Sequence, residues 1–325
     1  MEILEATETD IPKIVALLKV SLGESLMPKS ERYWQWKHME NPFGPSPVLL
    51  CLEKSELIGV RAFMRWQWKG QTQIFSAVRA VDTATHPDHQ GKGIFKKLTL
   101  SLVDYCKQRG DHFVFNTPNE QSKPGYLKMG WEVAGKLPIR LTLQRPFSIA
   151  RNFITKSHSV IDGENTDLKY YLHHPYLDSL IGQNRQQAGS MLTNTSVEYL
   201  KWRYLDVPVA RYVAIGEESG QKLTGLIIGR IKESRLGREL RITDIFLSHH
   251  DDGNGLIKKL KEVKKEWKID YTTSTGTAPS LRKTGLNLKA AIGPVVTIRT
   301  LSMEDLAMLR NFNQWSPSLG DLELF

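Results

Sequence analysis

The sequence predicts a mixed α/β (α+β) fold in which one arrangement of strands and helices occurs twice. Three observations lead to this prediction. Apolar stretches with strand-like and helix-like spacing alternate along the 325 residues. A strand, a glycine-containing loop and a helix follow one another at residues 82–98. Residues of the first half recur in the second half at nearly constant offsets, which is the signature of an internal repeat.

The first half starts with a short strand and two helices. The strand is expected at residues 3–6, and Thr9 or Asp10 caps a helix that has Pro12 in its first turn. Ser30 is the expected N-cap of the second helix. The later elements are expected as strands at residues 48–53, 57–68, 72–85 and 113–116, helices at 94–109 and 120–129, and a strand pair at 131–143.

The second half reads as a diverged copy of the first. An offset of 166 matches Ser30, Tyr33, Trp36, Lys37, Pro42, Leu57 and Gly59 to Ser196, Tyr199, Trp202, Arg203, Pro208, Leu223 and Gly225. The offset then falls to 162, which matches Asp82 to Asp244 and Gly93 to Gly255, and later to 155. We therefore expect two domains, residues 1–145 and 167–325, joined by a linker at residues 146–166.

Composition and charge restrict the class of protein. Lys and Arg number 44 against 35 Asp and Glu, a formal net charge of +9, which favours a polyanionic partner such as a phosphorylated cofactor. The basic residues are scattered, so nucleic acid ranks below a cofactor. Two cysteines form no disulfide framework and no zinc pattern. Together with the absence of a membrane span or secretory signal, this predicts a cytoplasmic protein.

The loop after the strand at residues 77–85 has the features of a phosphate site. Gly91 and Gly93 allow the backbone to approach a ligand closely. The helix that follows presents unpaired N–H groups and the positive end of its dipole, and Lys92 adds charge. In the second half Asp252 and Asn254 replace Gln90 and Lys92. An aspartate would repel a pyrophosphate, so only the first copy is expected to hold an anion.

These residues resemble the GNAT acetyltransferase superfamily. Its loop [QR]-x-x-G-x-[GA] opens a helix after a strand, and here it reads as residues 90–95, QGKGIF, preceded by His86-Pro87-Asp88. A second family feature is an Asn, then a Tyr seven residues later, then a Gly-aromatic pair. Residues 119–131, NEQSKPGYLKMGW, contain all of these in order. The resemblance implies two tandem domains, each a mostly antiparallel twisted sheet flanked by helices, the second degenerate.

The resemblance also implies where an acyl-CoA would bind. The backbone around the loop would hold the pyrophosphate, and the preceding strand would pair with the pantetheine arm. No metal is needed, because positioning an amine against a thioester supplies much of the rate. The cofactor-binding residues implied in this way are Val81, Thr83, Thr85, Gln90, Gly91, Lys92, Gly93, Ile94, Phe95 and Asn119.

Four positions leave alternatives open. Phe95 stands where the family has Gly or Ala, so its ring either narrows the cofactor slot or points into the core. Tyr126 matches the family's general acid but also suits a helix anchor. Asp82 is the candidate general base, whereas the survival of Asp244 in the second copy favours a structural hydrogen bond. Asn119 either contacts the cofactor or caps a helix.

The leading hypothesis is an N-acetyltransferase that transfers an acyl group from acetyl-CoA, or another acyl-CoA, to the amine of a small molecule such as an amino sugar. Two other hypotheses remain. One is a tandem GNAT-like enzyme that uses aminoacyl-tRNA as peptidyl transferase, and the other is a non-catalytic CoA-binding or scaffold module. The sequence names neither the acceptor nor the oligomeric state.

Overall fold

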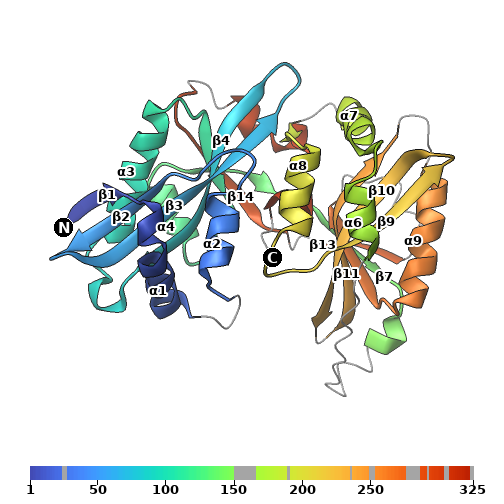
Figure 1. Cartoon of the computed structure of the whole chain (residues 1–325), viewed down its shortest axis with the longest axis horizontal. Helices are drawn as coiled ribbons and strands as arrows, with labels where there is room; N and C mark the ends of the chain where they lie inside the picture. Colours follow the sequence, from blue (N-terminus) through green and yellow to red (C-terminus); the bar gives the residue numbers. More distant parts are fainter. Residues whose placement is uncertain are drawn as a thin grey trace. The chain divides into compact units, whose positions relative to one another are not determined.

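The computed structural model describes most of the chain (Figure 1). The described residues are 1–23, 28–149, 166–188, 191–234, 236–248, 253–275, 286–290, 293–303 and 307–322. They form two compact units that interleave along the chain, whereas the sequence suggested contiguous domains. Unit 1 comprises Met1–Lys136, Asp206–Val209 and Pro294–Gln314, and unit 2 comprises Leu137–Leu205, Ala210–Gly293 and Trp315–Phe325. Most of the expected linker, residues 150–165, lies outside the described residues.

The sheet of unit 1 has the strand order β1-β2-β3-β4-β5-β14-β6. Neighbouring strands in this order are antiparallel except β4 and β5, which are parallel. The strand β14 comes from late in the chain and pairs with both β5 and β6. The bounds are β1 (Glu2–Glu5), β2 (Val48–Glu53), β3 (Glu56–Lys69), β4 (Ile74–Thr85), β5 (Phe113–Asn116), β6 (Glu132–Lys136) and β14 (Val295–Thr300).

Three helices of unit 1 begin where the sequence predicts, whereas the helix expected from residue 120 begins at Lys123. Asp10 precedes α1, which has a proline in its first turn, and Ser30 caps α2 by accepting a hydrogen bond from the Tyr33 N–H at 3.1 Å. Gly130, with φ +87°, follows α4. The helices are α1 (Ile11–Leu22), α2 (Glu31–His38), α3 (Ile94–Gln108), α4 (Lys123–Lys128) and α10 (Ala307–Arg310), with 3₁₀ turns η1 (Glu8–Asp10), η2 (Pro87–His89) and η5 (Phe312–Gln314).

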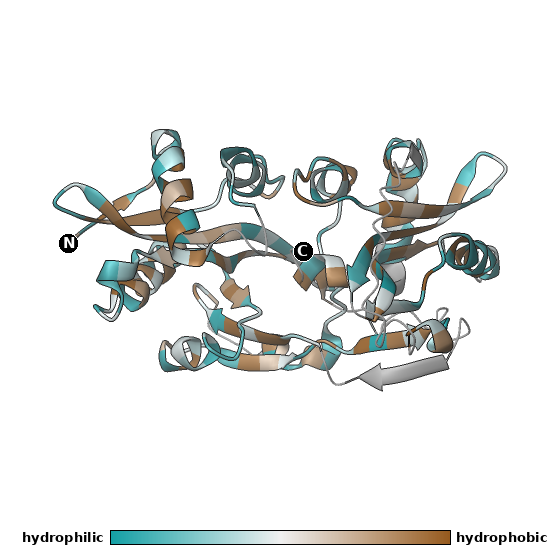
Figure 2. Cartoon of the chain, turned by 90° about the horizontal axis from the view of Figure 1, so that it is seen from below, coloured by the Kyte–Doolittle hydropathy of each residue, from teal (hydrophilic) through white to brown (hydrophobic). Residues whose placement is uncertain are grey.

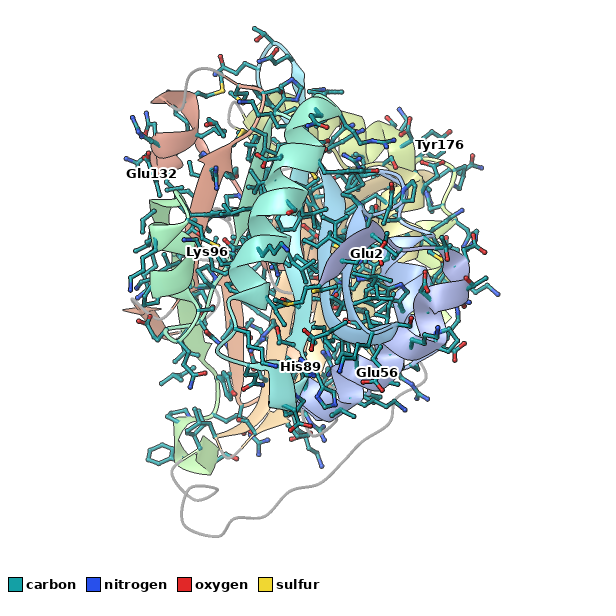
Figure 3. The ribbon with its side chains drawn as sticks, turned by 90° about the vertical axis from the view of Figure 1, so that its left-hand side faces the viewer. Glu2, Glu56, His89, Lys96, Glu132 and Tyr176 are labelled. Atoms are coloured by element: carbon teal, nitrogen blue, oxygen red, sulfur yellow. The ribbon has the colours of Figure 1, made fainter. Side chains whose placement is uncertain are left out.

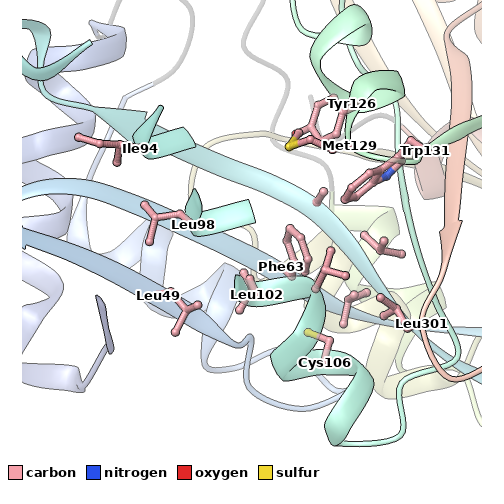
Figure 4. Packing of buried hydrophobic residues seen from close by; sticks show 14 of the residues in the cluster. Leu49, Phe63, Ile94, Leu98, Leu102, Cys106, Tyr126, Met129, Trp131 and Leu301 are labelled. Atoms are coloured by element: carbon pink, nitrogen blue, oxygen red, sulfur yellow. The ribbon is translucent and has the colours of Figure 1, made fainter. Parts of the chain in front are cut away.

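Both faces of this sheet are covered by apolar packing. On one face the buried side of α1 and Trp34 of α2 pack on Val60, Ala62 and Ala84. On the other face α3 packs on strands β2 to β5, together with Tyr126, Met129 and Trp131 (Figure 4). The long strand β3 contributes to both clusters, with Phe63 fully buried on the α3 side. This double burial fixes the position of the loop between β4 and α3.

The sheet of unit 2 has the order β13-β7-β12-β11-β10-β9, again with one parallel pair, β11 and β12. Hydrophobic residues concentrate on the strands of both units (Figure 2). The strands of this sheet are β7 (Ile139–Leu143), β9 (Val213–Ser219), β10 (Lys222–Ser234), β11 (Gly237–Leu247), β12 (Tyr271–Thr275) and β13 (Leu286–Ala290). The short β8 (Leu192–Thr193) does not belong to it. The helices are α6 (Thr166–Leu172), α7 (Leu177–Ala188), α8 (Val197–Leu200), its continuation η3 (Lys201–Leu205), α9 (Asn254–Glu266) and α11 (Leu319–Leu322).

The two sheets follow the same plan. In each, a hairpin (β2-β3 or β9-β10) leads to a third strand (β4 or β11). A helix follows this strand (α3 or α9), and the next strand (β5 or β12) pairs with it in parallel. The expected strand pair at residues 131–143 is divided, since β6 lies in the first sheet and β7 in the second. Within the described part of the chain, no helix has the length and apolar character to cross a bilayer.

Candidate active site

The loop that opens α3 combines two left-handed glycines with open space. Gly91 and Gly93 both have φ +76°, a conformation that a residue with a Cβ adopts only at a cost. A Cβ on either glycine would meet no atom within 4 Å, so a ligand can approach the backbone there. Gly93 is also the N-cap of α3, which places the free N–H groups of the first turn at this opening.

Positive side chains surround this opening. Lys92, Lys96 and Lys97 are exposed, as is Gln90. In Figure 3 Lys96 projects from the beginning of α3, and His89 lies in the loop ahead of it. The Lys92 Nζ is 3.3 Å from the His89 Nδ1, whose ring faces Glu53 at 3.4 Å. Free N–H groups, a helix N-terminus and lysines together suit an anionic phosphate group.

Strand β4 has an open edge just before this loop. It pairs in parallel with β5 only where Ala77, Val78 and Arg79 face Phe113, Val114 and Phe115. It then continues to Thr85 with β3 on one side, and no strand of the described chain pairs with its other side there. Val81, Thr83 and Thr85 lie on this stretch and are half-buried. An unpaired edge of this kind can accept an extended amide-bearing chain as an added strand.

The two helix residues that follow the glycines point into the molecule. Ile94 is 2% exposed and packs closely on Gly59, since a Cβ on that glycine would lie 2.7 Å from the Ile94 side chain. The ring of Phe95 is edge-on to the ring of Tyr126, with centroids 5.8 Å apart. Phe95 therefore packs between α3 and α4, and only its backbone N–H belongs to the loop.

Tyr126 is buried and bonded to a second buried residue that the sequence analysis missed. Its hydroxyl accepts a hydrogen bond from Arg61 Nη2 at 2.7 Å, and Arg61 Nη1 donates to the Val81 carbonyl at 2.7 Å. Arg61 is fully buried on β3, and its guanidinium contacts the rings of Phe63, Phe95 and Tyr126. A signal was present in the sequence, because Arg61 is the one charged residue in the apolar run LIGVRAFM.

Asp82 is engaged by two side chains of α2. Its Oδ2 is 2.5 Å from Lys37 Nζ and 2.9 Å from His38 Nε2. Burial alone would raise the pKa of Asp82, but the charge of Lys37 and the hydrogen bond with His38 hold it well below its usual range. Burial lowers the pKa of His38, whose Nδ1 lies 3.0 Å from Ser46 Oγ. A carboxylate held in this way is a weak base.

Asn119 lies in the turn that leads into α4, four residues before the helix begins. Its Oδ1 accepts hydrogen bonds from the backbone N–H and the hydroxyl of Ser122, each at 2.8 Å. The side chain is exposed. Asn119 therefore stabilises this turn through Ser122, the N-cap residue of α4, and its contact with a cofactor stays a prediction.

Comparison with known proteins identifies the first part of this chain. A family model described as an acetyltransferase (GNAT) domain matches residues 2–134. Residues 2–134 form a GNAT acetyltransferase domain. Members of this family use an acyl-CoA as co-substrate, and the loop, the open β4 edge and Tyr126 all lie within the matched residues.

Individual proteins are similar to this chain in sequence or in fold. The L-amino acid N-acyltransferase MnaT of Escherichia coli (strain K12) is 28% identical over 95 residues, which cover 28% of this chain and about half, 54%, of that enzyme. A GCN5-related N-acetyltransferase from Anabaena variabilis ATCC 29413 has TM-score 0.66 at 16% identity, covering 92% of this chain and 72% of its own. A probable N-acyltransferase from Enterococcus faecalis V583 has TM-score 0.65 at 12% identity, covering 94% and 74%. These two structures share the fold with this chain.

Unit 2 also holds a half-buried carboxylate at the place of Asp82, with different partners. Arg203, Tyr204 and Asp244 stand where Lys37, His38 and Asp82 stand in unit 1. The Tyr204 hydroxyl donates to Asp244 Oδ2. Burial raises the pKa of Asp244, although the hydrogen bonds from Tyr204 and Ser318 oppose the rise.

The loop of unit 2 differs from the GNAT loop in backbone as well as sequence. Gly253 has φ +73° like Gly91, but α9 starts directly after it, so the residue aligned with Gly93, Gly255, lies inside the helix. A Cβ on Gly255 would be 2.8 Å from Glu217 Oε1. The Glu217 carboxylate, 3.1 Å from Lys259 Nζ, therefore borders this turn. Asp252, expected to repel a pyrophosphate, lies outside the described residues.

A cavity of about 480 Å³ lies beside α2 in the GNAT domain. Its lining residues include Trp34, His38, Phe43 and Arg65. Other aromatic side chains of this domain belong to the core, since Trp36, Phe63, Trp66 and Trp68 are at most 1% exposed. Among the described residues, no three His, Cys, Asp or Glu side chains gather where they could hold a metal ion.

Proposed function

We propose that this chain is an acyl-CoA-dependent N-acyltransferase and that acetyl-CoA is its simplest donor. The observation that supports it best is the loop of Gly91 and Gly93, with left-handed backbone, open space in front and a helix N-terminus behind. The open edge of β4 next to it suits the pantetheine arm. The acyl group would then lie near Val81, beside Tyr126 and Arg61.

The roles of the site residues follow from their surroundings. Gln90, Lys92 and the N–H groups from Gly91 to Phe95 hold the pyrophosphate, and the backbone at Val81, Thr83 and Thr85 holds the pantetheine. Tyr126 donates a proton to the leaving sulfur. Asp82 keeps Lys37 and His38 in place, because its two short contacts and lowered pKa suit an anion that stays charged.

The acceptor is proposed to be a small amine that enters beside α2. The cavity lined by Trp34, His38 and Phe43 is large enough for an amino acid or an amino sugar, and His38 joins it to Asp82 on β4. The relative named as an L-amino acid N-acyltransferase makes L-amino acids the first acceptors to test. The rate at which CoA thiol is released from acetyl-CoA is measured with each L-amino acid and with glucosamine. The rates show which of the two classes of acceptor the protein uses.

The loop is tested by calorimetric titration with acetyl-CoA. Wild-type protein is expected to bind one molecule per chain, because the loop of unit 2 lacks the second left-handed glycine. Gly93→Asn is expected to weaken binding at least tenfold, since a side chain would then occupy the approach of the phosphate. Asn is among the side chains that tolerate positive φ.

Gly110→Asn is the matched control. Gly110 follows the other end of α3 and has φ +81°. A Cβ at this position would also meet no atom within 4 Å. The same substitution there imposes the same backbone cost without touching the N-terminus, and its affinity is expected to equal that of wild type. Failure of wild type to bind acetyl-CoA, or equal loss in both variants, would refute the proposed site.

A further inference from the structure

The Arg61 guanidinium is a buried positive charge without a carboxylate partner. Arg61 is fully buried, and no carboxylate of the described part of the chain lies within ion-pair distance of it. Its hydrogen-bond acceptors are a phenol oxygen and a peptide carbonyl, both neutral. Burial of an unpaired charge costs several kcal/mol in typical proteins. A site that retains such a charge is suited to an anion that arrives with a ligand or forms during a reaction.

Two hydrogen-bond donors at this position are unused. Arg61 Nε is buried and has no acceptor. Arginine donates only, so the Tyr126 oxygen is the acceptor of the Arg61 bond and the hydrogen of the phenol points elsewhere. No acceptor among the described residues receives that hydrogen. The phenol hydrogen therefore remains available to a ligand atom, whereas Arg61 Nε stays buried beneath it without an acceptor.

Unit 2 shows that the strand does not require an arginine here. The offset of 166 places Ile227 of β10 at the position of Arg61, and Ile227 is 1% exposed. An aliphatic side chain thus fills the equivalent place in the sheet that lacks the open loop. The charge occurs only in the unit that has the features of a cofactor site.

We propose that Arg61 is a positioning residue for acyl transfer, which holds the Tyr126 phenol with its hydrogen free and stabilises the negative charge on the departing CoA sulfur. This inference rests on the proposed function. The amine nitrogen forms a bond to the acyl carbon, the carbon–sulfur bond breaks, and the sulfur leaves with the electron pair. The phenol proton passes to the sulfur, which yields CoA thiol. The phenolate regains through water the proton that the nitrogen loses.

The magnitude follows from Coulomb's law. A positive charge about 5 Å from a sulfur anion, at an effective dielectric constant of about 20, favours the anion by about a hundredfold in an equilibrium or a rate. The same charge also favours ionisation of the free thiol of bound CoA. The inference can therefore be tested by measuring this ionisation, without catalytic turnover.

The experiment measures ionisation of the CoA thiol in its complex with the protein, by the ultraviolet absorbance of the thiolate as pH is raised. The background from the protein's own thiols is low, because burial raises the pKa of Cys51 and raises that of Cys106 further. Wild-type protein is expected to ionise bound CoA at lower pH than free CoA. Arg61→Ile is expected to lower the acid ionisation constant of the bound CoA thiol ten- to a hundredfold. It is expected to reduce kcat by a similar factor.

A second variant covers the case in which Arg61→Ile does not fold. Arg61→Lys keeps the charge, but the single ammonium group cannot donate to the Tyr126 phenol and the Val81 carbonyl at the same time in the geometry of a guanidinium. It is expected to leave thiol ionisation near that of wild type while kcat falls. In a Tyr126→Phe background, Arg61→Lys is expected to cause little further loss of kcat, since the phenol that it positions is gone.

Arg203→Met is the matched control for loss of a buried arginine. Arg203 in unit 2 is fully buried, donates to the Tyr212 hydroxyl at 3.0 Å and contacts two tyrosine rings. Its removal is expected to change stability but neither the thiol ionisation nor the pH dependence of kcat. Unchanged ionisation in Arg61→Ile, with CoA bound, would overturn the inference. Absence of CoA binding by wild type would instead overturn the proposed function.

Discussion

Asp82 shows how one residue can fit a catalytic and a structural role until its neighbours are known. The sequence places it on the strand next to the loop, where a general base would be useful. The structure surrounds it with Lys37 and His38, and Asp244 occupies the same place in unit 2 with Tyr204 as partner. A carboxylate kept in both units favours the structural role, and this is the role that we propose.

Substitution of Asp82 separates the two roles. Asp82→Asn removes the charge opposite buried Lys37 and is expected to destabilise the protein by about 3 kcal/mol, the typical cost of breaking a buried pair. Its pKa is lower in the folded protein, so its stabilising effect is complete above about pH 4 and is lost as pH falls further. Urea unfolding and kcat are measured together. A large loss of kcat with unchanged stability would contradict the structural role and favour Asp82 as the general base.

Lys264 gives a prediction for the alkaline end of the pH range. It is 4% exposed, its Nζ has no hydrogen-bond partner, and burial lowers its pKa to about 8, helped by the charge of Lys261. The unfolded chain therefore binds more protons between about pH 8 and 10.5, and stability rises across that window. Lys264→Leu is expected to stabilise the protein at pH 7 by about 3 kcal/mol and to remove this rise.

Exposed Lys265 provides the control on the same helix. Lys265→Leu is expected to change the free energy of unfolding by less than about 0.5 kcal/mol. Leu102 occupies the position of Lys264 in unit 1, so leucine is already accommodated in one copy. Equal effects of the two substitutions in urea unfolding at pH 7 and pH 10 would contradict the assignment.

At the scale of elements, local signals located most of unit 1. The apolar spacing and caps gave α1, α2, β2, β5 and the start of α3 to within a residue or two, because each is determined by its own sequence. The strand pair at residues 131–143 was misplaced for a different reason. Both strands have suitable patterns, but which sheet each joins depends on partners far away in the chain.

The loop element was also only partly visible in the sequence. The letters QGKG and DGNG indicated a difference in charge between the two copies. The structure adds a difference in backbone, since in unit 2 the helix α9 includes Gly255. This difference is decided by the packing of α9 and by Glu217 beside it, which no local pattern encodes.

For the whole molecule, the interleaving of the units predicts that the first half cannot fold alone. Strand β14 pairs with β5 and β6, and its Val296, Thr297 and Ile298 are fully buried. A fragment of residues 1–145 lacks β14 and exposes two strand edges and their apolar faces. It is expected to show no cooperative unfolding and no acetyl-CoA binding, by near-ultraviolet circular dichroism and calorimetry.

A peptide of residues 294–303, added in trans, is the complementing control. It supplies the missing strand and is expected to restore part of the near-ultraviolet signal, whereas a peptide with Val296 and Ile298 replaced by Asp is not. A fragment that folds alone with native affinity would show that the chain divides at residue 145, as the sequence suggested, and that β14 is dispensable.

The sequence by itself determined the GNAT loop, its glycines and the position of Tyr126, because each depends on residues close together in the chain. The tertiary structure alone decided three things: that Arg61 reaches Tyr126, that Asp82 is held by α2, and that β14 completes the first sheet. Each joins segments that are distant in sequence. Their partners are selected by burial and hydrogen bonding in the folded protein, which a linear pattern does not specify.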